Sequence, residues 1–350
     1  MKRIVAMLPL LAILSGCAHT SQYRNTAPLP ESIASLEETR LGGVKQWVLL
    51  RGKDTSKPVM LFIHGGPGGA EMSAVRRYFA PLEDDFVVVT YDQRGAGKSY
   101  SDRIPRESMT QEQFVADAHE LVLKLRERFN TPKVYLVANS WGTITGTLLA
   151  QRYPELVHAY VGVSQWTDGI ARERASYHLV LDWAKRTENK DAIRELEEIG
   201  PPPFTGPKAM DKVGTQKSWL LRSGGILYGR DNMGLMLDAL LWSGEYSLLE
   251  KWNFMKGLMF SMETVWPEAM QVDLTRSVPE LKMPVFFVSG RHDWNIPLSH
   301  VESYFQALHA PRKELVVFEN SAHVPHYEEA DKFVQFMREK VLAASPARMD

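Results

Sequence analysis

Short apolar runs recur along this chain and are separated by polar or Gly/Pro-rich segments. Their length and their content of Val, Phe and Tyr are typical of buried strands. The runs are Val59–Ile63, Phe86–Tyr91, Val134–Val137, Ala159–Val163, Val285–Val288 and Leu315–Phe318. Because the apolar residues are continuous rather than alternating, we expect both faces of the sheet to be covered, as in parallel sheets.

Helical patterns lie between the predicted strands. One begins at Thr110, which has Gln113 three residues later and so forms a capping-box sequence. Its apolar positions recur at helical spacing: Phe114, Ala118, Leu121, Leu125 and Phe129. Further helices are predicted over Gly142–Tyr153 and Glu329–Leu342. Strands that alternate with helices predict an α/β fold with a mostly parallel, doubly wound sheet.

The alternation stops near Trp166 and resumes near Met283. Between these points a polar helix is predicted over Ala184–Ile199, followed by a Pro-rich break and a Met-, Leu- and Trp-rich stretch over Leu235–Trp266. We interpret the segment as an inserted helical cap, in which most apolar residues pack in a core and a few cover a pocket. The predicted domains are therefore a core in two parts, 33–165 and 283–350, and a cap, 166–282.

The N-terminus has the layout of a secretory signal peptide. Lys2 and Arg3 precede the apolar run Ile4–Leu14, which is shorter than the roughly 20 residues that span a bilayer. Leu-Ser-Gly-Cys at positions 14–17 resembles the lipobox of bacterial lipoproteins, in which the cysteine thiol takes a diacylglyceryl group and the cysteine becomes the first residue of the mature chain. The resemblance implies a signal peptide over 1–16, a tether over 17–32 and a lipid anchor at Cys17. An ordinary cleaved signal or a buried helix is the alternative.

Composition narrows the chemistry further. The resemblance to bacterial lipoproteins, with Ala18 rather than Asp after the cysteine, implies that the protein is anchored on the periplasmic face of the outer membrane. Cys17 is the only cysteine, so the mature domain has no disulfide, no cysteine nucleophile and no thiolate metal site. The formal net charge of −1 does not favour nucleic acid as a partner. The sequence leaves the oligomeric state open.

A candidate nucleophile follows the third predicted strand. Residues 138–142 read Ala-Asn-Ser-Trp-Gly and lie between that strand and a predicted helix. This is the context of a nucleophile elbow, whose usual motif is Gly-x-Ser-x-Gly. Ala138 replaces the first glycine and keeps the small volume that the tight turn needs. Ser140 is therefore the predicted nucleophile.

A serine nucleophile needs a base and an acid that orients the base. In the strand-turn-helix arrangement described above, the acid and then the base follow the serine along the chain, each after a strand. Asp293 and His323 follow the last two predicted strands, in that order. His326 is the competing base and we expect it at the pocket rim. His292 is expected to line the pocket or to be structural.

A Gly-rich segment follows the first predicted strand. Residues 64–69 read His-Gly-Gly-Pro-Gly-Gly, and such a loop lets backbone N–H groups approach a carbonyl oxygen. We predict an oxyanion hole formed by the N–H groups of Gly66 and Trp141. His64 is expected to orient the loop. The segment contains neither a Walker Gly-Lys-Ser/Thr nor a Gly-x-Gly-x-x-Gly motif, which argues against phosphate binding.

Together these residues resemble the prolyl iminopeptidase-like branch of the α/β-hydrolases. The resemblance depends on residues 64–69, on Asp-Gln-Arg-Gly-Ala-Gly-Lys-Ser at 92–99, on Ser140-Trp-Gly, and on Asp293 and His323. It implies the α/β-hydrolase fold, the release of N-terminal residues, often proline, from peptides, and catalysis without a metal or organic cofactor. Its substrate would be a small molecule or a short peptide.

Aminopeptidases of this branch hold the substrate ammonium with carboxylates. By resemblance, Glu263 lies at about the expected distance before the acid-bearing strand, and Glu173 and Glu245 are other cap candidates. Relatives carry a second carboxylate directly after the catalytic Asp, where this chain has Trp294. A solvated helix face is the simpler explanation for each of these glutamates.

The sequence therefore predicts a serine hydrolase that forms an acyl-enzyme. An aminopeptidase is the first hypothesis, and a carboxylesterase or lactonase is the second. A non-catalytic envelope protein on a hydrolase fold is the third, and the complete set of Ser, His and Asp argues against it.

Overall fold

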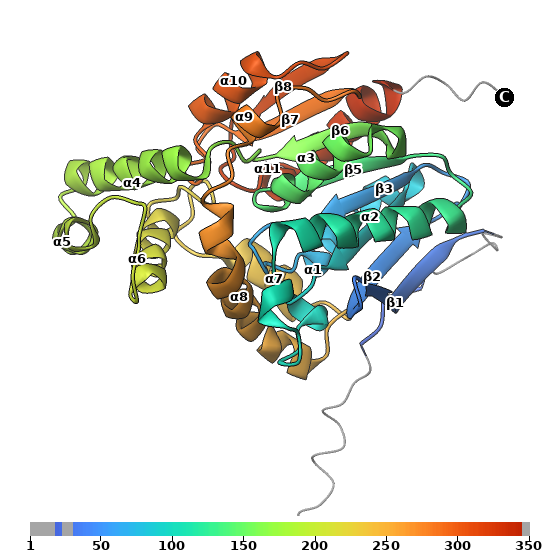
Figure 1. Ribbon diagram of the computed structural model, residues 1–350, viewed down its shortest axis with the longest axis horizontal. Helices are drawn as coiled ribbons and strands as arrows, with labels where there is room; N and C mark the ends of the chain where they lie inside the picture. Colours follow the sequence, from blue (N-terminus) through green and yellow to red (C-terminus); the bar gives the residue numbers. More distant parts are fainter. Residues whose placement is uncertain (1–17, 23–30, 345–350) are drawn as a thin grey trace, which may run out of the picture.

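The computed structural model describes residues 18–22 and 31–344. A single eight-stranded sheet in the order β1-β2-β4-β3-β5-β6-β7-β8 forms the centre (Figure 1). Strands β1 and β2 are antiparallel, and β3 to β8 are parallel, in agreement with the predicted fold class. The strands are β1 Ile33–Leu41, β2 Val44–Gly52, β3 Val59–Ile63, β4 Val87–Asp92, β5 Val134–Asn139, β6 Val157–Val163, β7 Val285–Gly290 and β8 Lys313–Phe318.

Helices cover both faces of the sheet, as the continuous apolar strands require. Leu61 and Leu136 face a core shared with α2 and α3, whereas Met60 and Val137 face a core shared with α1 and α12. The period-two alternation of a strand divides each apolar run between the two cores. The covering helices are α1 Met72–Tyr78, α2 Gln111–Arg128, α3 Gly142–Arg152, α10 Leu298–Ala307, α11 Pro325–Glu328 and α12 Ala330–Phe336.

The segment between β6 and β7 is helical, and we refer to it as the cap. In Figure 1 helices α4 to α6 project to the left of the sheet, and α7 and α8 lie below them at the centre. The cap helices are α4 Gly169–Arg186, α5 Lys190–Ile199, α6 Ala209–Arg222, α7 Gly234–Leu241, α8 Leu248–Ala269 and α9 Leu274–Ser277.

The predicted single helix over Ala184–Ile199 was wrong. Helix α4 ends at Arg186, and Glu188 has φ +52°, which a helix does not accommodate. Asn189 then caps α5, because its side chain accepts a hydrogen bond from the backbone N–H of Ala192. The polar stretch is therefore the join between two helices.

Two other helix predictions need smaller corrections. Thr110 caps α2 by accepting from the N–H of Gln113, but the Gln113 side chain donates to Asp117 instead of closing the capping box. The last predicted helix is regular only to Phe336, and Met337–Val341 continues as a π-helical turn.

Candidate active site

The turn between β5 and α3 presents Ser140. Its φ of +52° lies in the left-handed region, which non-glycine residues rarely adopt and which is found at strained functional turns. A Cβ at Gly142 would lie 2.3 Å from the carbonyl oxygen of His64, so this position must be glycine. Ala138 fits because Gly146 faces it from α3: a Cβ at 146 would be 2.9 Å from that of Ala138. The missing side chain at position 146 therefore leaves room for the methyl group of Ala138.

The structure brings the predicted triad together. Nε2 of His323 lies 2.8 Å from Oγ of Ser140, and its Nδ1 lies 2.9 Å from Oδ2 of Asp293. The other oxygen of Asp293 accepts the backbone N–H groups of Asn295, at 2.9 Å, and Ile296, at 2.8 Å. All three triad residues are buried. The carboxylate is thus fixed by the loop after β7, and it fixes the imidazole in turn.

Asn295, which sequence reasoning missed, contacts the same histidine. Its Nδ2 lies 3.0 Å from Nε2 of His323, and its Oδ1 accepts a hydrogen bond of 2.7 Å from Nζ of Lys217. Lys217 comes from α6 in the cap, so the cap contacts the base through one amide. A signal was present in the sequence, since Asn295 lies two residues after the predicted acid.

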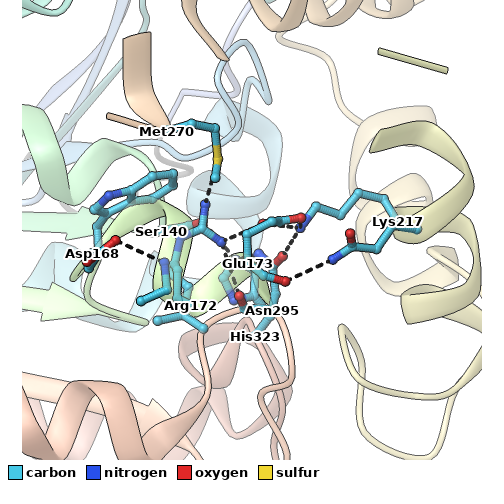
Figure 2. Close-up of polar contacts among 12 residues, drawn as sticks. Ser140, Asp168, Arg172, Glu173, Lys217, Met270, Asn295 and His323 are labelled. Atoms are coloured by element: carbon cyan, nitrogen blue, oxygen red, sulfur yellow. Dashed lines mark hydrogen bonds and ion pairs between the residues drawn. The ribbon is translucent and has the colours of Figure 1, made fainter. Parts of the chain in front are cut away.

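A buried charge cluster adjoins this amide (Figure 2). Glu173 lies between two cations: Nζ of Lys217 is 2.7 Å from its Oε1, and the Arg172 guanidinium is 3.1 Å from its Oε2. The guanidinium stacks 3.6 Å from the ring centroid of Trp166. Burial lowers the pKa of both Arg172 and Lys217, and the charge of Glu173 opposes that shift. Sequence reasoning selected Glu173 but neither cation.

A cavity of about 440 Å³ opens beside Ser140 and His323. Arg172, Lys217 and Asn295 line one part of it. The remaining wall is largely apolar and comes from the cap, with Met233, Met236, Leu237, Leu240, Phe254, Met255, Leu258 and Met262. The cavity can accept an acyl group of moderate size, which burial against these side chains would stabilise.

Hydrogen bonds between His64 and Gln93 hold the Gly-rich loop in place. Nε2 of His64 accepts the backbone N–H of Gln93 at 3.0 Å, and the side chain of Gln93 donates to the His64 carbonyl at 2.8 Å. Nδ1 of His64 is then the protonated nitrogen and faces the Gly65 carbonyl at 2.8 Å. Gly66 lines the cavity with φ +121°, so only glycine fits there. His64 lies where a residue that orients the loop should lie.

His326 lies away from the pocket rim. It is fully buried, and its Nε2 is 3.7 Å from Oε2 of Glu71. Glu71 also accepts from Gly65 N–H, Asn139 Nδ2 and Tyr327 Oη–H, at 3.0, 3.2 and 2.8 Å. Burial raises the pKa of Glu71, but His326, the charge of His64 and the Gly65 N–H outweigh it and leave the pKa below its usual value. Through Gly65 and Asn139, Glu71 therefore holds the Gly-rich loop and the turn that carries Ser140 in place.

The other predicted binding residues lie elsewhere. Glu263 is exposed and pairs with Arg106 at 3.4 Å. Glu245 is buried and lies 3.9 Å from Arg76. Trp294 packs against Gly225 rather than facing the cavity. Neither these three residues nor Glu173 lines the cavity that Ser140 lines, but Glu173 contacts Arg172 and Lys217, which do.

The remaining sequence predictions concern the histidine beside the acid, the anchor and cofactors. His292 stacks on the ring of Tyr228 at 4.1 Å, away from Ser140, and Cys17 lies outside the described residues. Over residues 18–22 and 31–344, no helix is both long and apolar enough to cross a membrane. Within the same ranges, no group of three or more His, Cys, Asp or Glu residues is placed to hold a metal ion.

Comparison with known proteins agrees with this geometry. Residues 58–193 match the family model described as the alpha/beta hydrolase fold. The probable aminopeptidase YbaC of Bacillus subtilis (strain 168) is 34% identical over 306 residues, which cover 87% of this chain and 96% of that protein. The chain therefore belongs to the α/β-hydrolase family, and its relatives are proline iminopeptidase-like.

Two further matches extend the likeness. The proline iminopeptidase of Heyndrickxia coagulans is 25% identical over 283 residues, covering 79% of this chain and 87% of that protein. The crystal structure of a proline iminopeptidase-related protein from Thermus thermophilus superimposes with a TM-score of 0.64 at 17% identity. That superposition covers 90% of this chain and 99% of the Thermus chain, and it shows the shared fold.

Proposed function

We propose that the protein is a serine hydrolase that acts through an acyl-enzyme. The observation that supports this most directly is the continuous hydrogen-bond chain from Ser140 through His323 to Asp293, which ends at the cavity. Ser140 Oγ attacks the substrate carbonyl carbon while Nε2 of His323 takes its proton. Asp293 holds the imidazole and stabilises its charged form.

The later steps use the same groups. The N–H groups of Gly66 and Trp141 stabilise the tetrahedral oxyanion, each contributing roughly 2.7–4 kcal/mol. His323 passes its proton to the leaving group as the bond to that group breaks. It then takes a proton from the water that attacks the acyl-enzyme, and it returns that proton to Ser140 Oγ as the acyl C–O bond breaks and the acid leaves.

For the substrate class we propose an aminopeptidase, and the relatives support this choice. They are named as an aminopeptidase and a proline iminopeptidase and are similar over most of their length. Glu173 is the predicted cap glutamate that contacts cavity-lining side chains, so we assign any contact with a substrate ammonium to it.

A carboxylesterase or lactonase is the second candidate, and the charge balance around Glu173 favours it. That carboxylate already lies against Arg172 and Lys217, so an ammonium group would have to compete with two cations. The apolar cap wall of the cavity suits an uncharged acyl chain equally well.

Three substrates distinguish these candidates. Hydrolysis of a proline arylamide, the same arylamide N-acetylated, and a short-chain p-nitrophenyl ester should be compared, with Ser140→Ala as the blank. Cleavage of the free-amine arylamide but not the acetylated one supports the aminopeptidase. Cleavage of the ester alone supports the second candidate and removes any role for Glu173 in ammonium binding.

A serine-reactive fluorophosphonate tests the catalytic proposal itself. We expect covalent labelling of the parent chain and none of Ser140→Ala, with both proteins equally folded by circular dichroism. Absence of labelling in the folded parent would reject both hydrolase candidates and leave a non-catalytic envelope protein.

We also propose that Cys17 is lipidated and that the protein is anchored at the bacterial cell envelope, on the periplasmic face of the outer membrane. The sequence of residues 1–18 supports this, as argued above. Mass spectrometry of the N-terminal peptide from membrane fractions tests it. A mature chain that begins at an unmodified residue other than Cys17 would contradict the proposal.

A further inference from the structure

Exposed large apolar side chains gather in one part of the cap. Over the described residues, ten large apolar side chains are strongly exposed, and eight of them lie between positions 237 and 259. We call these eight the apolar face: Leu237, Leu241, Trp242, Leu248, Leu249, Trp252, Met255 and Met259. Single exposed apolar residues are ordinary, but a cluster of this size marks an interaction surface.

Helix α8 contributes an ordered stripe to this face. Leu248, Trp252, Met255 and Met259 follow each other at intervals of four, three and four residues, so they share one side of the helix. The other side packs inward, where the Ser261 hydroxyl donates to the backbone carbonyl of Gly95 in the loop after β4. An amphipathic surface helix normally presents polar residues to water, whereas α8 is apolar on its outer side as well.

The apolar face is continuous with the mouth of the cavity. Leu237 and Met255 belong to the face and also line the cavity that Ser140 lines. Trp242 and Trp252 are the most exposed members, with 85% and 74% of their surface accessible. Tryptophan is the side chain enriched at membrane–water interfaces, where its ring contacts lipid and its N–H remains hydrated.

The N-terminal segment is held beside the same face. The backbone N–H of His19 donates to the carbonyl of Gly244 at 2.8 Å, and Gly244 lies between α7 and α8. Gly244 lies two residues after Trp242, an exposed member of the face. The described chain therefore begins beside the apolar face, and the proposed anchor Cys17 directly precedes its first described residue, Ala18, in the sequence.

We propose that the apolar face docks onto the lipid bilayer, with the cavity mouth turned toward the membrane. His19, which follows the proposed anchor by two residues, the exposed tryptophans and the opening of the cavity then share one side of the molecule. A lipid anchor at Cys17 would hold the chain at the membrane without setting its orientation, and an apolar face with interfacial tryptophans supplies a second contact that sets it. This inference goes beyond the proposed hydrolase activity and does not depend on it.

Fluorescent labels at two exposed positions of the full chain test the orientation. Trp252→Cys places a thiol on the apolar face, and Leu123→Cys is the matched control, since Leu123 is a strongly exposed apolar residue on α2 in the core domain. The parent chain, whose only cysteine is Cys17, is the labelling blank. Each protein is labelled with bimane and reconstituted into vesicles of phosphatidylethanolamine and phosphatidylglycerol.

On vesicles, we expect a doxyl-labelled phospholipid to quench the bimane fluorescence at position 252 strongly. Iodide dissolved in the water should quench the fluorescence at this position little. The label at position 123 should respond in the opposite way. Equal iodide quenching at both positions would overturn the proposal. Protection at position 252 from both quenchers would also overturn it, because a second copy of the chain or another protein would then cover the face; sedimentation analysis identifies the self-associated case.

Discussion

Glu173 is the residue that keeps two cations stable beside the nucleophile. Arg172 and Glu173 are almost fully buried and Lys217 is largely so, and the carboxylate contacts both positive groups. Removing one partner of a buried ion pair leaves an uncompensated charge, which costs more than the pair contributes. At the residue scale, this cluster holds the amide of Asn295 against His323.

Glu173→Gln should therefore lower the free energy of unfolding by roughly 3 kcal/mol. Urea denaturation measures the change. Glu263→Gln is the matched control, because Glu263 pairs with Arg106 in solvent and such pairs contribute about 0–1 kcal/mol. Equal stability of the two variants would show that Arg172 and Lys217 do not depend on Glu173.

Asp293→Asn should reduce kcat by roughly 10⁴ while the fold is kept. An amide at this position can donate to Nδ1 of His323, which favours the tautomer that cannot take the Ser140 proton. The rate on whichever substrate the parent cleaves gives the measurement. Glu319→Gln, an exposed carboxylate after β8 that pairs with Arg291, should retain full activity. A loss below tenfold in Asp293→Asn would remove Asp293 from the triad.

The sequence predicted the triad residues but not their neighbours, and the reason is geometric. Ser140, Asp293 and His323 each follow a parallel strand, and carboxyl ends of parallel strands meet at one edge of the sheet. Arg172 and Lys217 come from α4 and α6, whose positions depend on cap packing that no local pattern encodes. For the same reason, Glu263 and Glu245 were plausible from the sequence but do not reach the cavity.

At the scale of elements, strand prediction succeeded where the apolar residues were continuous. The six predicted strands correspond to β3 to β8, with ends that differ by at most two residues. Strands β1 and β2 were not predicted, because polar residues interrupt both: β1 contains Ser, Glu, Thr and Arg, and β2 contains Lys, Gln and Arg. The other edge strand, β8, is also largely half-buried, but it was predicted because Leu315–Phe318 is a continuous apolar run.

The close approach between the start of α3 and the end of β3 depends on Gly142. A methyl group there would lie 2.3 and 2.7 Å from the carbonyl oxygens of His64 and Ile63, and backbone cannot give way as a flexible side chain can. Gly142→Ala should lower the free energy of unfolding by about 1–3 kcal/mol and reduce fluorophosphonate labelling, because the elbow must move.

Gly214→Ala is the control for that substitution. Gly214 lies inside α6, and a Cβ there would meet no atom within 4 Å. Alanine is favoured over glycine in a helix interior by roughly 0.5–1 kcal/mol, so this variant should be slightly more stable than the parent. If both variants lost the same stability, the backbone contact would not be the cause at Gly142.

At the scale of the whole molecule, the cap is fastened to the core near the start of α8. Tyr246 donates its hydroxyl to Asp92 at the end of β4, at 2.8 Å, and Lys98 pairs with Glu250 at 2.6 Å. These contacts hold the apolar face in a fixed relation to the sheet. Asp92 also accepts the backbone N–H of Lys98, and both residues belong to the 92–99 motif on which the family resemblance depends. In this protein the same motif also attaches the cap to the core.

Asp92 also makes the free energy of unfolding of the protein depend on pH. Burial raises its pKa from 3.8 to about 7, against the lowering effect of the Lys98 N–H and the Tyr246 hydroxyl. Between pH 3.8 and about 7 the folded protein keeps a proton that the unfolded chain has released. Through this residue, therefore, the free energy of unfolding falls as pH rises across that window and is constant above it.

Asp92→Asn removes this dependence, because an amide does not titrate. Relative to the parent, the variant should gain about 2–3 kcal/mol in free energy of unfolding between pH 5 and pH 8, whatever the offset from its altered hydrogen bonds. Urea denaturation of both proteins at several pH values gives the difference. Asp231→Asn, at an exposed position in the cap, should differ from the parent by the same amount at every pH. If the difference in free energy of unfolding between Asp92→Asn and the parent did not change with pH, the pKa of Asp92 would be the same in the folded and the unfolded chain. The Tyr246 hydroxyl would then donate to an ionised carboxylate.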